Sequence, residues 1–199
     1  DVSWLIEFHF YQHNPPDDFI DDGLTPEKFE TYTAKPGQLA LLQTKMLPYL
    51  DANGNPVGFN ETAQRLALAY CFLHDVAAKT WYFRYDRIDD YLKLLDAKTA
   101  FFDGGEWLYY ADNDAWAADL PEAVRLGGYR HPDKTAAVLV ALNGGETPVT
   151  FTPRVGEALL GRAITSVTDA DSGKALPLAG GAVGPVTIDR HGVRLWIVE

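Results

Sequence analysis

The spacing of apolar positions along this chain changes near residue 120. Upstream, the mostly apolar run from Val2 to Phe10 ends before Asn14-Pro15-Pro16 and predicts a buried strand. Apolar residues recur at helical spacing after Asn60, whose amide can cap a first helical turn. The same spacing returns after Asp86, and the aromatic segment from Trp81 to Tyr85 predicts a strand between these two helices.

Two more helices are predicted in the upstream part. Thr25-Pro26-Glu27 has the composition of a helix start, with a capping hydroxyl followed by proline in the first turn. The apolar residues between Leu39 and Leu47 predict a short helix that ends before Pro48. The segment from Asp51 to Pro56 predicts a turn. This alternation of strands and helices is typical of an α/β layered or barrel fold.

Downstream, helical spacing is replaced by short apolar runs separated by turn sequences such as Asn143-Gly144-Gly145 and Asp171-Ser172-Gly173. The runs are Ala123–Tyr129, Ala136–Leu142, Pro148–Thr152, Ile164–Asp169, Val183–Ile188 and Val193–Val198. They predict an antiparallel β-sandwich of at least six strands, without helix beyond residue 125 and with Trp196 facing inward. The sequence therefore predicts two domains: residues 1–120, of α/β class, and residues 121–199, all β.

Composition narrows the range of partners. The 199 residues carry a net charge of −11, which argues against nucleic acid or an anionic membrane, since both bind clustered Lys and Arg. No apolar run reaches the length of about 18 residues that predicts a membrane span. The single cysteine, Cys71, excludes an internal disulfide and is expected to be an inert core residue.

Motifs for cofactors are also lacking. The sequence has no glycine-rich phosphate loop, no Cys-x-x-Cys and no Gly-x-Ser-x-Gly, so nucleotide, zinc, redox and serine-hydrolase classes are disfavoured. His9 and His13 lie four residues apart, but that spacing suits a shared metal only on a helix. We predict neither a metal nor a cofactor.

Three downstream segments, VLVALNGGETPVTF, SVTDADSGKAL and RHGVRLWIVE, resemble the β-sandwich that closes many barrel glycoside hydrolases. The upstream Trp-x-x-Glu strand and the segments LTPEKF, FNETAQRLALAYCFLHDV and FFDGGEWLYYADN are similar to the last barrel elements of glycoside hydrolases of the family 123-like group. The resemblance implies the last strands and helices of a (β/α)8 barrel followed by a sandwich. A whole barrel needs about 250 residues, so the barrel is predicted to be incomplete.

This resemblance implies a carbohydrate substrate and, as a second partner, the missing N-terminal barrel segment. The strand edges and apolar faces of a partial barrel are expected to need that partner or to aggregate. The compartment stays open, because a leader can precede a chain that starts within a strand. An extracellular or periplasmic location is slightly favoured over a cytoplasmic one.

Glu7 is the candidate catalytic residue, because barrel enzymes place their reactive groups at the carboxyl ends of the strands. Glycoside hydrolysis uses paired carboxylates, and burial between apolar neighbours is expected to raise the pKa of Glu7 as an acid requires. Because successive side chains of a strand point to opposite faces, Leu5, Glu7 and His9 are predicted to lie on one face of this strand. The resemblance places the principal acidic pair on an earlier strand, which implies a substrate-contacting role for Glu7. Alternatively, Glu7 pairs with a cation or lies on an exposed edge strand.

Six further residues are candidates for substrate binding: His9, His13, His74, Asp75, Trp81 and Asp86. The histidines and carboxylates are expected to hydrogen-bond sugar hydroxyls, and the indole of Trp81 is expected to stack on a sugar ring. Each has a structural alternative. His13 is then an ordinary loop residue, His74 interacts with a helix C-terminus, and Trp81 packs in a core.

Two functional hypotheses follow from the sequence. In the first, the chain is the C-terminal part of a glycoside hydrolase and contributes to its substrate site. In the second, it is a non-catalytic carbohydrate-binding or structural module. They differ in whether Glu7, His74 and Asp86 converge on one cleft. A third possibility is an unrelated α+β protein with an immunoglobulin-like tail.

Overall fold

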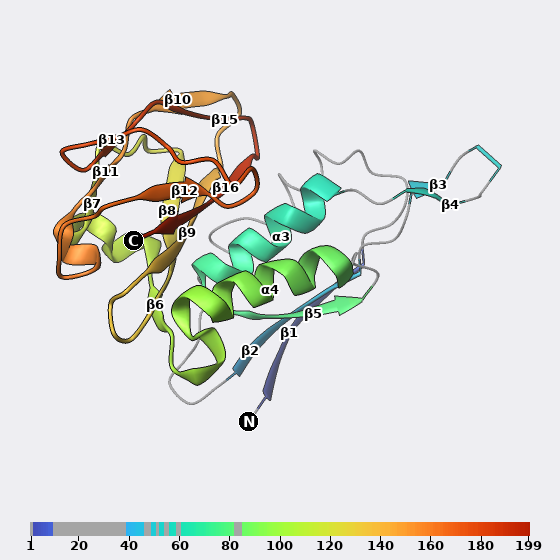
Figure 1. The fold of residues 1–199 in the computed structure, drawn as a ribbon. Helices are drawn as coiled ribbons and strands as arrows, with labels where there is room; N and C mark the ends of the chain where they lie inside the picture. The colour runs from blue at the N-terminus through green and yellow to red at the C-terminus, as the bar shows by residue number, and fades with distance from the viewer. Residues whose placement is uncertain are drawn as a thin grey trace. The chain divides into compact units, whose positions relative to one another are not determined.

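A computed structural model of the chain describes residues 2–9, 39–45, 49–50, 52–53, 56–58, 61–81 and 85–199. The chain divides into two compact units, Asp1–Asp90 and Tyr91–Glu199, and the division falls within helix α4 (Tyr85–Thr99). Figure 1 labels the helices and strands of both units.

The first unit contains a parallel sheet of three strands, β1 (Val2–His9), β2 (Leu39–Lys45) and β5 (Ala77–Trp81), in the order β1-β2-β5. Helix α3 (Glu61–Leu73) lies between β2 and β5 in the chain, because parallel neighbours need a crossover connection. The predicted strand that begins at Val2 and the predicted helix after Asn60 are both confirmed.

The helix predicted between Leu39 and Leu47 is wrong, because this segment forms strand β2. β2 pairs with β1 on one side and with β5 on the other, so it is the central strand of the sheet. The central strand of a parallel sheet is a continuous apolar run, and a short run of that kind does not distinguish a strand from a helix. Backbone pairing with β1 and β5 on its two sides makes this segment a strand.

Of the strand predicted from Trp81 to Tyr85, Trp81 is the last residue of β5 and Tyr85 begins α4, and residues 82–84 lie outside the described residues. The predicted turn between Asp51 and Pro56 joins a small antiparallel pair, β3 (Tyr49–Leu50) and β4 (Pro56–Gly58). The helix predicted to start at Thr25 lies outside the described residues.

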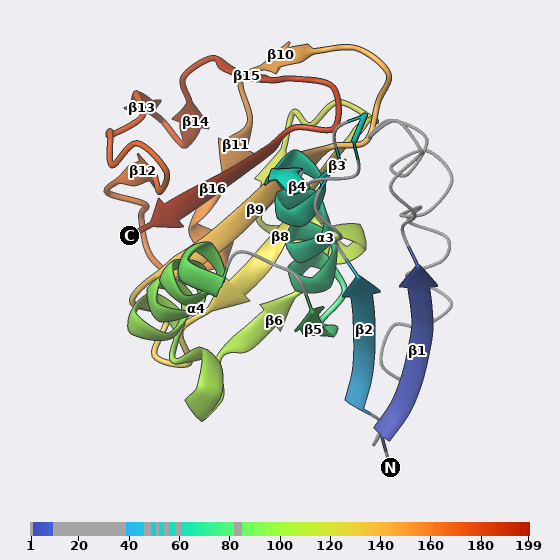
Figure 2. The same ribbon diagram turned by 90° about the vertical axis from the view of Figure 1, so that its right-hand side faces the viewer.

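The second unit is a β-sandwich (Figure 2). One layer is an antiparallel sheet of five strands in the order β12-β16-β9-β8-β6. Their bounds are β6 Glu106–Leu108, β8 Val124–Arg130, β9 Ala137–Asn143, β12 Val167–Asp169 and β16 Val193–Val198. The opposing strands form a four-stranded sheet, β13-β14-β11-β7, and a two-stranded sheet, β10-β15. Their bounds are β7 Ala117–Ala118, β10 Val149–Phe151, β11 Arg154–Val155, β13 Leu178–Ala179, β14 Ala182–Val183 and β15 Val186–Ile188.

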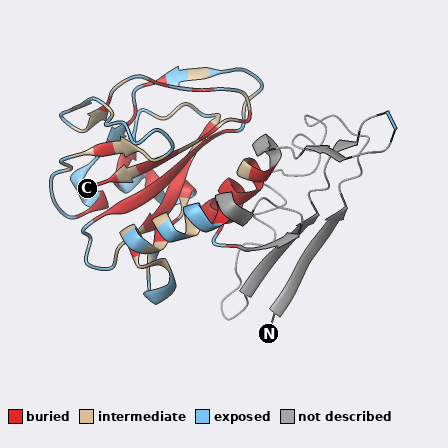
Figure 3. Ribbon diagram, turned by 45° about the vertical axis from the view of Figure 1, so that its right-hand side comes forward, coloured by how far each residue is buried: buried red, intermediate tan, exposed pale blue. Residues whose placement is uncertain are grey.

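The sandwich core lies between these sheets, and Figure 3 shows the central strands as continuously buried. Trp196 of β16 is 0% exposed and belongs to one core cluster with Leu126 of β8, Leu139 of β9 and Val155 of β11. The predicted sandwich and the inward orientation of Trp196 are confirmed. Beyond residue 125, helical structure is limited to one 3-10 turn, η3 (Glu157–Leu159).

The predicted strand Val183–Ile188 is two strands. Ala182–Val183 pairs with β11 and β13, whereas Val186–Ile188 pairs with β10 in another sheet. Pro185 separates the two pieces, and proline has no N–H for a ladder. The chain therefore changes sheets at this residue.

The second unit begins well before residue 120. The C-terminal half of α4 is joined to the sandwich by two side-chain bonds, from Tyr91 Oη to Asp171 Oδ1 (3.1 Å) and from Lys98 Nζ to Glu199 Oε1 (2.5 Å). After α4 come the 3-10 turns η1 (Phe101–Asp103) and η2 (Tyr110–Ala115), and β6 pairs with β8. A functional boundary between residues 120 and 121 stays a prediction.

One prediction concerns the thiol of Cys71, which is buried within α3. Burial raises the pKa of Cys71 to about 12 from its ordinary value of 9.0. Between these values the folded chain keeps a proton that the unfolded chain has lost, so the free energy of unfolding falls as pH rises, by about 1.4 kcal/mol per pH unit. Urea unfolding from pH 9 to 11 should show this extra slope, and the Cys71→Ala variant should lack it. Equal slopes would contradict the prediction.

Candidate functional site

The carboxyl edge of the parallel sheet brings together several residues that the sequence singles out. His9 lies opposite Lys45 of β2, and Lys45 lies opposite Trp81 of β5. Because the strands are parallel, all three carboxyl ends lie at one edge, and Figure 2 shows β1 and β2 running side by side in the same direction. Open and closed parallel sheets bind their ligands at this edge. His9 and Trp81 are therefore placed where a substrate site is expected.

Glu7 lies two residues before the edge, in a row with Gln43 of β2 and Lys79 of β5. The pairing of β1 with β2 is irregular here, because Leu5 lies opposite Leu42 and Glu7 lies opposite the next residue, Gln43. From Glu7 to His9 the pairing with Gln43, Thr44 and Lys45 is uninterrupted, and the prediction that Leu5, Glu7 and His9 share a face stays a prediction.

Asp86 is the second residue of α4, and only three residues separate the end of β5 at Trp81 from the start of α4 at Tyr85. Asp86 therefore follows the carboxyl end of β5 by five residues along the chain. His13 lies outside the described residues.

His74 and Asp75 lie at the opposite edge of the sheet, because they follow α3 and precede the amino end of β5 at Ala77. His74 is 0% exposed, its ring stacks on that of Tyr70 with centroids 6.3 Å apart, and its backbone N–H donates to the Tyr70 carbonyl oxygen (3.1 Å). Asp75 is exposed at a φ of 51°, a left-handed conformation typical of a helix end. These two residues do not converge with Glu7 and Asp86.

Gln43 and Lys45 lie opposite Glu7 and His9 in the sheet and were not among the residues predicted from the sequence. Because their segment was predicted as a helix, the sequence did not place either residue at the end of a strand. A useful signal was present, since the apolar run Leu39–Leu42 is followed at once by the polar residues Gln43, Thr44 and Lys45. Polar residues at the end of an apolar run are typical of a parallel strand that reaches a site.

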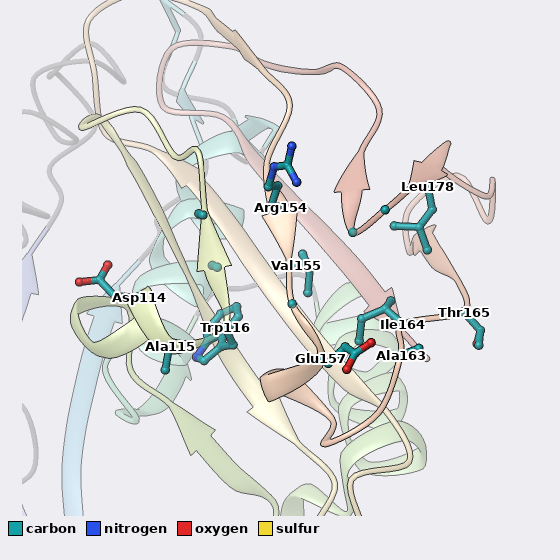
Figure 4. A pocket seen from close by; sticks show the side chains of 15 residues that line it. Asp114, Ala115, Trp116, Arg154, Val155, Glu157, Ala163, Ile164, Thr165 and Leu178 are labelled. Carbon is teal, nitrogen blue, oxygen red and sulfur yellow. The ribbon is translucent and has the colours of Figure 1, made fainter.

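A second candidate region is a cleft of about 760 Å³ in the sandwich unit (Figure 4). Four chain segments line it: residues 114–118, 154–157 and 163–165, and residues 178, 180 and 181. Its charged groups are Asp114, Glu157 and Arg154, and Arg154 Nε donates to Asp119 Oδ2 (2.9 Å). No local sequence pattern predicts this cleft, because alanines and glycines from distant segments form much of its lining.

Two exclusions hold for the part of the chain that the structure describes. No group of three or more His, Cys, Asp or Glu residues there is placed to hold a metal ion. Within the same residues, no helix is both long enough and apolar enough to cross a membrane.

Comparison with known proteins gives a likeness of fold. No protein-family model matches the chain, and no curated protein matches it. Among solved structures, the chain is similar to a GH27 β-L-arabinopyranosidase from Geobacillus stearothermophilus, with a TM-score of 0.55 and 12% sequence identity. The match covers 100% of this chain and 44% of the arabinopyranosidase. A variant of the same enzyme in complex with arabinose matches with the same TM-score and identity.

A protein from Bacillus halodurans assigned as an α-N-acetylgalactosaminidase matches with a TM-score of 0.53 and 11% identity, over 96% of this chain and 43% of that one. The chain therefore spans less than half the length of these structures. At this level of identity the likeness shows a shared fold. The family 123-like assignment is not confirmed by these structures and stays a prediction.

Proposed function

We propose that this chain is the C-terminal part of a glycoside hydrolase, supplying the last strands of a (β/α) barrel and an accessory β-sandwich. The observation that carries the proposal is the fold match over 100% of the chain to a GH27 β-L-arabinopyranosidase. The order of elements agrees with it, since a parallel β-α-β arrangement precedes the antiparallel sandwich. The proposed substrate class is a glycoside.

We propose that the carboxyl edge of the parallel sheet contributes to the substrate site. Glu7 and Asp86 would supply carboxylates, which glycoside hydrolysis uses in pairs to protonate the leaving oxygen and to attack or activate water. His9 would hydrogen-bond a hydroxyl, and Trp81 would stack on a sugar face. If the principal acidic pair belongs to another strand, the role of Glu7 is to hold a substrate hydroxyl.

Hydrolysis assays test the proposal. The chain should be assayed alone and within the product of its full reading frame, with nitrophenyl glycosides of β-L-arabinopyranose and α-N-acetylgalactosamine among a wider panel. We expect the full product to cleave at least one glycoside. If it cleaves none while it is folded and monodisperse, the hydrolase proposal is wrong.

A second candidate is a non-catalytic carbohydrate-binding or structural module. The chain spans 44% of the arabinopyranosidase it matches, which favours this reading over a hydrolase that acts by itself. Saccharide binding without hydrolysis by the full product would support the module. Hydrolysis that requires Glu7 would support the hydrolase.

Glu7→Gln is expected to lower kcat/KM of the full product about 10- to 100-fold, as expected from losing a charged hydrogen bond to substrate. The thermal midpoint should change little, because glutamine has nearly the same shape. Thermal unfolding and steady-state kinetics on the same preparation test this. Glu122→Gln, at an exposed residue of the other unit, is the control and should change neither quantity. A large fall in thermal midpoint with unchanged activity per folded molecule would instead assign Glu7 a structural role.

A further inference from the structure

The cleft in the sandwich unit has a floor that leaves backbone accessible to a ligand. β7 pairs with β11 beneath it, and the floor residues Ala117, Ala118 and Gly156 have small side chains or none. At one end the β13–β14 hairpin turns through Gly180 and Gly181, whose φ values of 56° and 80° are those of a tight two-residue turn. A ligand can therefore approach the peptide groups of the floor closely.

The walls of the cleft are apolar and fixed. Trp116 is 7% exposed and belongs to the sandwich core, and the partly buried Ile164 and Leu178 pack against the same core. Side chains held by core packing lose little freedom when a ligand binds. The cleft is thus a preformed surface with apolar patches at set positions.

The polar groups of the cleft are mainly acceptors. Asp114 and Glu157 are exposed and lie on either side of Trp116 in Figure 4. Within the described residues neither carboxylate forms an ion pair, whereas the guanidinium of Arg154 is paired with Asp119. The cleft is therefore net negative, and this charge disfavours phosphates, nucleotides and other anions.

We propose that this cleft binds a neutral saccharide, a role that the proposed function leaves unassigned. A pyranose ring presents hydroxyl donors around its edge and C–H groups on its faces. Carboxylates accept hydrogen bonds from hydroxyls, and the partly buried Ile164 and Leu178 offer apolar contact for the ring faces. The volume of about 760 Å³ lies within the range of small-molecule sites, so more than one ring can be accommodated.

An NMR titration of the full ¹⁵N-labelled chain with lactose and with L-arabinose tests the proposal. We expect saturable shifts of the Gly156, Gly180 and Gly181 amides and of the Trp116 indole N–H. The dissociation constant for at least one sugar is expected to be on the order of 1 mM. It should not change with added NaCl, because the ligand carries no charge.

Two matched variants make the test specific. Asp114→Asn with Glu157→Gln should weaken binding at least tenfold and leave the thermal midpoint unchanged, since both residues are exposed. Asp133→Asn with Glu146→Gln changes two carboxylates that are 82% and 74% exposed outside the cleft, and it should leave binding unchanged. Equal loss of binding in both double variants would overturn the proposal.

Other outcomes would also overturn it. These are an absence of saturable shifts with either sugar, or shifts confined to residues outside the cleft. Binding of spermine at the cleft, weakened by salt and without sugar binding, would assign the site to cations. Because this readout uses amide shifts of the chain alone, it can fail or succeed independently of the hydrolysis assays.

Discussion

Gly128→Ala is expected to prevent the sandwich from folding or to destabilise it by more than about 4 kcal/mol. Gly128 lies in β8 opposite Leu139 of the central strand β9. Its φ of 149° is a backbone conformation that residues with a side chain rarely adopt. A Cβ atom there would lie 2.1 Å from the carbonyl oxygen of Val138. That oxygen is backbone of a strand paired on both sides, so it cannot move without breaking the sheet. Urea unfolding followed by tryptophan fluorescence measures the loss.

Gly144→Ala is the matched control. Its Cβ atom would meet only the Ala123 carbonyl oxygen at 3.7 Å and Leu142 Cδ2 at 3.9 Å, which are ordinary contacts. The free energy of unfolding should stay within about 0.5 kcal/mol of the parent chain. If Gly128→Ala unfolds at the same urea concentration as Gly144→Ala, β8 and β9 are not as close at this point as described.

Asn143→Asp is expected to destabilise the sandwich by about 3–5 kcal/mol at neutral pH, since it leaves a buried charge without a partner. The Asn143 side chain is 0% exposed, and its Nδ2 donates to the carbonyl oxygens of Thr147 (2.9 Å), Ile188 (3.2 Å) and Asp189 (3.1 Å). A carboxylate would present negative charge to three acceptors and has no hydrogen to donate. Chemical denaturation of the variant measures the effect.

Asn113→Asp provides a graded comparison. Asn113 is also buried, but its Nδ2 donates to a single carbonyl oxygen, that of Leu126 (2.9 Å). The free energy of unfolding should therefore fall less than it does for Asn143→Asp. Equal losses would show that desolvation alone, and not the number of facing carbonyl oxygens, sets the cost at Asn143.

The sandwich was predictable because its turns are encoded locally. Asn143 accepts a hydrogen bond from the Gly145 N–H (2.9 Å), which is the reason that Asn-Gly-Gly ends a strand here. Asp169 likewise accepts from the Ser172 N–H (2.8 Å), and Gly173 takes the left-handed φ of 67°. In such segments a few neighbouring residues determine the backbone conformation.

The errors have a different physical origin. β2 was predicted as a helix because its conformation depends on pairing with β1 and β5, which are distant in sequence. His74 was a site candidate by residue type, but its place at the end of α3 puts it at the far edge of the sheet. The cleft around Trp116 is formed by four chain segments that are brought together by the tertiary fold, and no local sequence pattern predicts that arrangement.

The position of β16 has a consequence for how the sandwich is made in the cell. β16 lies between β12 and β9, and its residues 193–198 pair with residues 137–142, which are synthesised much earlier. Translation proceeds at about 5–20 residues per second, so β9 leaves the ribosome several seconds before its partner. Until then one side of β9 has no strand to pair with, and nascent chains that stall before residue 193 should be substrates for chaperones.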